Sequence, residues 1–182
     1  MEVKLVNFDK VSLRKLNDNV DEYKLLEKWY QQEKIYLQFE QRKLNLEEVK
    51  KKYYPRTLED AIVPVYIIEY DNVPVGIIQY KLLDDESKII YGLNEDNIYE
   101  LDIFIGELTY HRKGIGYKSI MLISKYLFEE KNADLLVMCP LKDNNGAINC
   151  YKKCDFKIIN KYVAENTIGV LQEYILMVKE HK

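Results

Sequence analysis

The chain has 182 residues, of which 47% are hydrophobic and 31% charged, a balance typical of one globular domain with its own core. Its 30 acidic and 27 basic residues give a formal net charge of −3, which argues against a nucleic-acid-binding surface because such surfaces are usually basic. The sequence has no secretory signal and no apolar run long enough to span a membrane, so we expect a cytoplasmic protein that binds neither nucleic acid nor membrane.

The cysteines and histidines suggest neither a disulfide framework nor a metal site. Three cysteines are present, Cys139, Cys150 and Cys154, without C-x-x-C spacing, and we expect reduced thiols. The two histidines, His111 and His181, lie far apart in the sequence, so we expect no bound metal.

The first half of the chain predicts a strand and two helices followed by a run of strands. No repeat or linker divides the sequence, so residues 1–182 are expected to form one domain. The expected elements are a strand at 3–8, a helix from Asp18 or Asn19 to about Gln32, a short helix after the capping box Asn45–Glu48, and strands at 63–70, 75–82 and 97–105. Asp71-Asn72 is a hairpin signal between the second and third of these strands.

The second half alternates helices and strands. We expect a helix from Gly114 to about Asn132, a buried strand at 135–139, a helix at 144–153, and final strands at 156–163 and 170–179. The fold class predicted from this order is α/β, with a mixed, mostly antiparallel sheet flanked by helices.

The segment His111-Arg112-Lys113-Gly114-Ile115-Gly116 joins an expected strand to the N-terminus of a long helix. Unpaired backbone N–H groups and the positive end of the helix dipole lie at such a terminus, and glycines allow a phosphate to approach closely. The segment matches neither a P-loop nor a dinucleotide fingerprint. The two glycines alone fit an ordinary helix start equally well.

The order of motifs resembles the GCN5-related N-acetyltransferase (GNAT) family. In that family the turn reads [R/Q]-x-x-G-x-[G/A] and a later helix carries N-x-x-A-x-x-x-Y, which Asn144 to Tyr151 match here. The resemblance extends from about Tyr66 to Lys179 and implies a single GNAT-type domain that uses acetyl-CoA as acyl donor. Two positions depart from the pattern: His111 replaces arginine or glutamine, and Asp155 replaces the glycine before the final aromatic residue.

The resemblance also implies which residues contact the coenzyme. Those implied are Phe104 and Ile105 through their backbone, the turn residues Arg112, Lys113, Gly114, Ile115 and Gly116, and Asn144. Asn144 is explained equally well as the cap of its own helix. Tyr151 would protonate the departing thiolate, although most of the 16 tyrosines must be structural.

Asp102 is a carboxylate within an otherwise apolar strand, where it must face solvent or a polar cleft. The resemblance implies that Asp102 contacts the reacting amine and acts as the base. Glu100 lies on the same strand face and is the competing candidate. A plain solvent-facing position is the alternative for Asp102.

The expected acceptor follows from charge and from a narrower resemblance. Residues 84–107 contain eight acidic residues against Lys88 alone, which favours either a solvated acidic loop or a field that attracts a polycationic amine. Residues 65–76 and 101–107 and the Lys28-Trp29 pair resemble bacterial aminoglycoside 6'-N-acetyltransferases, whereas 83–97 match poorly. This resemblance implies an acceptor site lined by Trp29, Tyr30, Glu100 and Asp102, although Trp29 is also explained as a core residue.

The predicted activity is direct, ternary-complex acetyl transfer to the 6'-amine of an aminoglycoside antibiotic, and hence antibiotic resistance. The alternatives within the family are a protein N-terminus or lysine, a polyamine or a siderophore. A non-catalytic acetyl-CoA-binding sensor is the alternative of another class. The sequence leaves open whether the protein is a monomer or a homodimer.

Overall fold

An eight-stranded sheet in the order β1-β2-β3-β4-β5-β6-β8-β7 forms the centre of the computed structural model, which describes residues 5–181. The strands are β1 (Leu5–Phe8), β2 (Val11–Lys15), β3 (Val65–Tyr70), β4 (Val73–Leu82), β5 (Ile98–Ile105), β6 (Leu135–Met138), β7 (Lys157–Glu165) and β8 (Leu171–Glu180). Every neighbouring pair is antiparallel except β5 and β6, which are parallel. The predicted mixed, mostly antiparallel α/β fold is therefore confirmed.

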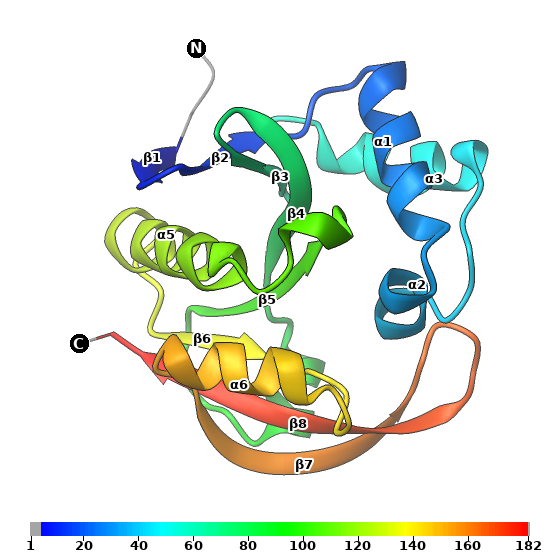
Figure 1. Cartoon of the computed structure of the whole chain (residues 1–182). Helices are drawn as coiled ribbons and strands as arrows, with labels where there is room; N and C mark the ends of the chain where they lie inside the picture. Colours follow the sequence, from blue (N-terminus) through cyan, green and yellow to red (C-terminus); the bar gives the residue numbers. More distant parts are fainter. Residues whose placement is uncertain (1–4, 182) are drawn as a thin grey trace.

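Helices cover both faces of this sheet. They are α1 (Val20–Tyr30), α2 (Glu33–Phe39), α3 (Leu46–Tyr53), α4 (Asp85–Tyr91), α5 (Ile115–Glu130) and α6 (Asn145–Lys153), with short 3-10 turns η1 (Tyr54–Arg56) and η2 (Leu108–Tyr110). Figure 1 shows α5 on one side of the central strands and α1–α3 grouped on the other. The predicted caps Asn19, Asn45 and Asn144 each accept a backbone N–H of their helix, which satisfies one of its free donors.

Two main hydrophobic clusters lie on opposite faces of the sheet, and β5 contributes to both because its successive side chains alternate. Leu101 packs into the cluster beneath α5 and α6. Phe104 packs into the cluster beneath α1–α3, where its ring makes edge contacts with Trp29 and Tyr30. Asp102 lies between these two residues and shares the face of Phe104.

Three elements were missing from the sequence-based prediction: β2, α2 and α4. In β2, Ser12 is buried and Arg14 is half-buried, and both hydrogen-bond Glu69 of β3. These inward polar residues break the alternation from which a strand is predicted. Helix α2 has no side-chain N-cap and buries only Ile35, so its local signal is weak. The predicted first strand began at residue 3, and residues 3 and 4 lie outside the described range.

Candidate active site

Strands β5 and β6 pair over only three residues and then end at different points. Their register runs from Ile98 opposite Leu135 to Glu100 opposite Val137, after which β6 ends at Met138 while β5 continues to Ile105. The far half of β5 therefore has β4 on one side and no strand on the other. Backbone groups without a strand partner can pair with an extended ligand, as a missing strand would.

The backbone carbonyl groups of the last two residues of β5 point in opposite directions. The carbonyl oxygen of Phe104 lies against Gly76 of β4. Because backbone groups alternate along a strand, Ile105 faces the unpaired side, and His111 Nε2 lies 2.8 Å from its carbonyl oxygen. Of the two residues expected to offer backbone groups to the coenzyme, Ile105 thus faces the opening and Phe104 faces β4. No pattern in the sequence indicated the contact between His111 and the Ile105 carbonyl oxygen.

The turn before α5 has the backbone geometry of an anion site. Arg112 has φ of 62° and Gly114 has φ of 74°, which bends the chain so that its N–H groups converge. Among the described residues, the six successive N–H groups of residues 112–117 donate no hydrogen bond. A Cβ added to Gly114 would meet nothing within 4 Å. Six free donors, two exposed basic side chains and a 16-residue helix dipole therefore point at open space.

Tyr151 lies on α6, which packs against the start of α5. A Cβ added to Gly116 would lie 3.6 Å from Sγ of Cys150, the residue next to Tyr151. Tyr151 is 8% exposed, and its hydroxyl makes no hydrogen bond within residues 5–181. Within this range only Ser124 Oγ is a fully enclosed side-chain oxygen without a partner, so the Tyr151 oxygen retains access to solvent.

The electrostatic surroundings of Tyr151 keep its phenol protonated. Burial and then the negative charge of Asp102 raise the pKa of Tyr151 well above its ordinary value. A neutral phenol that accepts and donates no internal hydrogen bond is suited to donate a proton to a ligand.

Asp102 is exposed near the middle of β5 and is held by one neighbour. Gln79 lies opposite it on β4, and the Gln79 Nε2 atom donates to Asp102 Oδ2 at 2.9 Å. Arg56 in turn donates from one guanidinium nitrogen to Gln79 Oε1 at 2.5 Å. Sequence reasoning missed both Gln79 and Arg56. The regular alternation of the two strands could have indicated Gln79, whereas nothing in the sequence pattern indicated Arg56.

Glu100, the competing carboxylate, is engaged on both oxygens. Lys81 lies 3.0 Å from Glu100 Oε2, and the Tyr91 hydroxyl donates to Oε1 at 3.3 Å. Burial and then the charge of Asp102 raise the pKa of Glu100, while the partners Lys81 and Tyr91 oppose this rise. Glu100 therefore lies in the wall of the site, whereas Asp102 Oδ1 has no partner within the described residues.

The structure places Trp29 and Tyr30 in the core, with exposed fractions of 0% and 1%. Trp29 Nε1 donates to Glu107 Oε1 at 2.9 Å, and the Tyr30 hydroxyl lies 2.7 Å from the hydroxyl of Tyr53. Their rings pack under β5 because burial of such large apolar surfaces stabilises the fold. The alternative core interpretation of Trp29 fits the observed burial, and the expectation that Trp29 and Tyr30 line the acceptor site stays a prediction.

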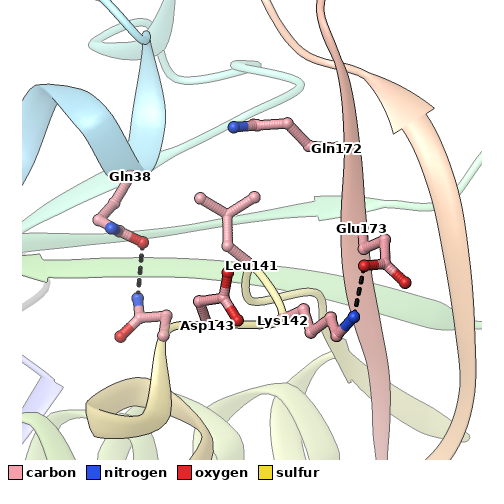
Figure 2. Close-up of a pocket in the computed structure, with 7 residues that line it drawn as sticks. Gln38, Leu141, Lys142, Asp143, Gln172 and Glu173 are labelled. Atoms are coloured by element: carbon pink, nitrogen blue, oxygen red, sulfur yellow. Dashed lines mark hydrogen bonds and ion pairs between the residues drawn. The ribbon is translucent and has the colours of Figure 1, made fainter.

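Asn144 closes one side of a polar pocket. Its Oδ1 atom caps α6 by accepting from Ala147 N at 3.1 Å, and its Nδ2 atom donates to Gln38 of α2 at 2.9 Å. The pocket has a volume of about 290 Å³ and is lined by Gln38, Leu141, Lys142, Asp143, Asn144, Gln172 and Glu173. Figure 2 shows Gln38 reaching across it and Lys142 paired with Glu173, whose charged atoms are 2.5 Å apart.

The acidic segment is partly neutralised by its surroundings. Besides the Lys81–Glu100 pair, Lys28 lies 2.5 Å from Glu107, and Asp84 caps α4 by accepting from Ser87 N. The attraction for a polycation is consequently weaker than the sequence count suggests.

Cys139 follows β6 at the edge of the opening. Burial and then Glu100 raise the pKa of its thiol to about 12, which disfavours the nucleophilic thiolate. Across residues 5–181 no three His, Cys, Asp or Glu side chains form a metal-binding group. In the same range no helix is long and apolar enough to cross a membrane.

Comparison with known proteins connects this geometry to an enzyme family. A family model described as an acetyltransferase (GNAT) domain matches residues 18–163. The aminoglycoside acetyltransferase AAC(6')-Ib in complex with coenzyme A and kanamycin superposes with a TM-score of 0.73 at 20% identity, over 94% of this chain and 95% of that one.

Two further solved structures share the fold. An uncharacterized protein from Bacillus halodurans has a TM-score of 0.80 at 20% identity, over 98% of this chain and 90% of its own. The ribosomal L7/L12 alpha-N-protein acetyltransferase RimL has a TM-score of 0.77 at 13% identity, over 100% of this chain and 96% of its own. At these identities the likeness shows a common fold, and the substrates named for AAC(6')-Ib and RimL differ.

Proposed function

The chain belongs to the acetyltransferase (GNAT) family and is an acetyl-CoA-dependent N-acetyltransferase, and we propose that it acetylates a primary amine of an aminoglycoside, at the 6' position. The observation that carries this proposal is the row of six free N–H groups at residues 112–117, next to the unpaired side of β5. The pyrophosphate of acetyl-CoA would bind the N–H groups, and its pantetheine arm would pair with β5 beside Ile105.

The chemistry proposed for the site is a direct transfer. Asp102 Oδ1 accepts a proton from the substrate ammonium, and the neutral amine attacks the thioester carbonyl carbon. The C–N bond forms and the C–S bond breaks, and Tyr151 donates its proton to the sulfur of the leaving coenzyme. As the amide forms, the nitrogen gives up its second proton to the phenolate through solvent, and the proton held by Asp102 is released to solvent, which restores both groups.

Asp102 is the better base because its surroundings leave one oxygen free. Glu100 already binds Lys81 and Tyr91, and an ammonium would have to displace one of them. Among the described residues Asp102 accepts from Gln79 alone, and it is exposed.

The polar pocket supports an aminoglycoside as the acceptor. Carboxylates from Asp143 and Glu173 and amides from Gln38 and Gln172 line it, and such groups bind ammonium and hydroxyl groups of sugars. The fold shared with an enzyme solved with kanamycin, and the resemblance of the strands around Asp102, support the same acceptor class.

A second candidate acceptor is the α-amine of a peptide or amino acid. Arg56 hydrogen-bonds Gln79, which in turn donates to Asp102, so one cation lies two hydrogen bonds from the proposed base. A substrate with an anionic group close to its amine would be attracted by this cation.

An acceptor panel tests the proposal. Purified protein is given acetyl-CoA with kanamycin, ribostamycin, peptides with free N-termini, or polyamines, and acetylated product is identified by mass spectrometry. Acetylated kanamycin, together with reduced drug susceptibility of cells expressing the chain, is the expected result. Product with peptides alone would establish the second candidate. Coenzyme binding without transfer to any amine would refute the enzyme proposal and favour a sensor.

A further inference from the structure

We propose that Gln79 and Arg56 form a positioning relay that fixes the carboxylate of Asp102 in the orientation needed for proton transfer. This inference rests on the proposed function of Asp102 as the base. It adds two residues that contact neither coenzyme nor acceptor in the scheme above and that act through Asp102.

The relay joins three elements by two hydrogen bonds. Arg56 lies in η1, Gln79 in β4 and Asp102 in β5, and Gln79 and Asp102 are direct partners in the antiparallel register. The distance of 2.9 Å from Gln79 to Asp102 is that of an ordinary N–H···O hydrogen bond, and the distance of 2.5 Å from Arg56 to Gln79 is shorter. Adjacent strands therefore hold the amide next to the carboxylate without a flexible loop between them.

The arginine determines which way the amide points. A guanidinium group can only donate hydrogen bonds, so the group of Gln79 that faces Arg56 must be the amide oxygen. The amide nitrogen then faces Asp102 and donates to Oδ2. Oδ2 is thereby occupied, and Oδ1 is the oxygen left to accept a proton from the substrate.

Arg56 is itself anchored to the core. Its guanidinium carbon lies 5.2 Å from the ring centroid of Tyr53, a cation–π contact, and Tyr53 is buried with its hydroxyl 2.7 Å from that of Tyr30. No carboxylate pairs with Arg56 among residues 5–181. The aromatic ring and the Gln79 amide therefore set its position, and the relay extends from the core of α1 and α3 to the site.

The placement of Gln79 indicates more than a surface role. Val75, Gly76, Ile77, Ile78 and Tyr80 around it on β4 are all buried. Gln79 is itself half-buried, and a partly buried amide stabilises the fold best where its hydrogen bonds are made. Here both of its polar ends are used, one by Arg56 and one by Asp102.

A double-mutant cycle tests whether Gln79 acts through Asp102. Gln79→Leu should lower kcat about tenfold or more with little change in acceptor KM, because a displaced base costs rate rather than binding. In an Asp102→Asn background the same change should lower kcat no further. Equal effects of Gln79→Leu in both backgrounds would show that it acts independently of Asp102 and would overturn the relay.

Arg56→Lys examines the other end of the relay. Lysine keeps the charge but lacks the planar group that stacks on Tyr53 and faces the amide, so kcat should fall by less than it does in Gln79→Leu. Arg42→Lys is the matched control, because Arg42 pairs with exposed Glu48 away from the site and should keep the wild-type kcat. Wild-type kcat in Arg56→Lys and in Arg56→Ala would remove Arg56 from the relay.

A spectroscopic measurement decides the inference independently of activity. The side-chain amide resonances of Gln79 should shift, and their hydrogen exchange should accelerate, in Asp102→Ala, which removes the acceptor. Unchanged resonances and exchange would overturn the relay even in an active enzyme. If the wild-type protein acetylates no amine while these resonances do shift, the proposed function fails and the hydrogen-bonded relay stands as a structural feature.

Discussion

Replacing Tyr151 with phenylalanine should lower turnover without weakening the fold. The Tyr151 hydroxyl makes no hydrogen bond within the described residues, so its removal breaks no internal contact and leaves the ring packed against Phe156. The change in unfolding free energy should therefore be a few tenths of a kcal/mol at most, and kcat should fall about 10²-fold, the lower end for general acids, because the leaving thiolate is itself a stable anion.

Tyr23→Phe provides a matched control of opposite effect. Tyr23 is 2% exposed and its hydroxyl donates to Asp18 at 2.7 Å, at the start of α1 and away from the unpaired side of β5. Losing this bond should cost about 1 kcal/mol and lower Tm by roughly 2–4 °C. Its kcat should stay at the wild-type value. The two tyrosine variants thus separate proton donation from structural support.

The assay for this comparison has to respect the thiols of the protein. A hydrogen bond from Cys154 lowers the pKa of the half-buried Cys150 thiol, so this group would consume a thiol reagent added to detect free coenzyme. Chromatographic separation of acetyl-CoA and coenzyme A avoids the interference. Tyr151→Phe protein with wild-type kcat and normal Tm would refute the assignment of Tyr151 as proton donor.

Three further predictions concern the glycines and the buried carboxylate. Gly114→Val should weaken acetyl-CoA binding about tenfold, because a φ of 74° costs a branched residue roughly 1–2 kcal/mol. Calorimetry measures the Kd, and an unchanged Kd would contradict the anion site. Gly106→Ala should destabilise by about 1–3 kcal/mol in urea unfolding, since its Cβ would lie 2.2 Å from the Trp29 ring, and a wild-type midpoint would disprove this contact. The pKa of Glu100 is raised above 4.5 in the folded protein, so the folded protein binds more protons at this group than the unfolded chain, and its stability falls as pH rises from 4.5 through the raised pKa. Glu100→Gln should therefore make Tm depend less steeply on pH. An unchanged dependence of Tm on pH would show that other groups cause it.

The parts of the fold that the sequence predicted are those with a local cause. Asn19, Asn45 and Asn144 cap helices through hydrogen bonds within four residues, and the Asp71-Asn72 turn follows from two residues that tolerate positive φ. Helix α4 had comparable signals, the Asp84 cap and the Gly92 terminus with φ of 69°, and it was missed because the segment was interpreted as an acidic loop.

The site also contains features with a local cause, which the sequence predicted, and features that depend on tertiary contacts, which it did not. The turn at Gly114 depends on neighbouring residues and on the helix that follows, so its sequence pattern indicates its geometry. The contact from Arg56 to Gln79 spans 23 residues, and so does the contact from Gln79 to Asp102; both exist only after β4 and β5 pair and η1 packs against them. The interior position of Tyr30 likewise depends on Tyr53, which no local pattern connects to it.

In the proposed scheme, the backbone and the side chains of β5 contact the two substrates, acetyl-CoA and the acceptor amine, on different sides of the strand. The backbone of Ile105 faces the unpaired side, where the coenzyme would lie, while Asp102 points from the face shared with Phe104, where the acceptor would lie. A slip of one residue between β4 and β5 would move Asp102 to the opposite face and separate it from Gln79. Gly76 resists such a change, because a Cβ there would lie 2.2 Å from the Phe104 carbonyl oxygen, so the strands approach this closely only at a glycine. The close approach of β4 and β5 at Gly76 turns the Phe104 carbonyl oxygen toward β4. The backbone groups of Ile105 then face the side where the coenzyme would lie, and Asp102 stays opposite Gln79.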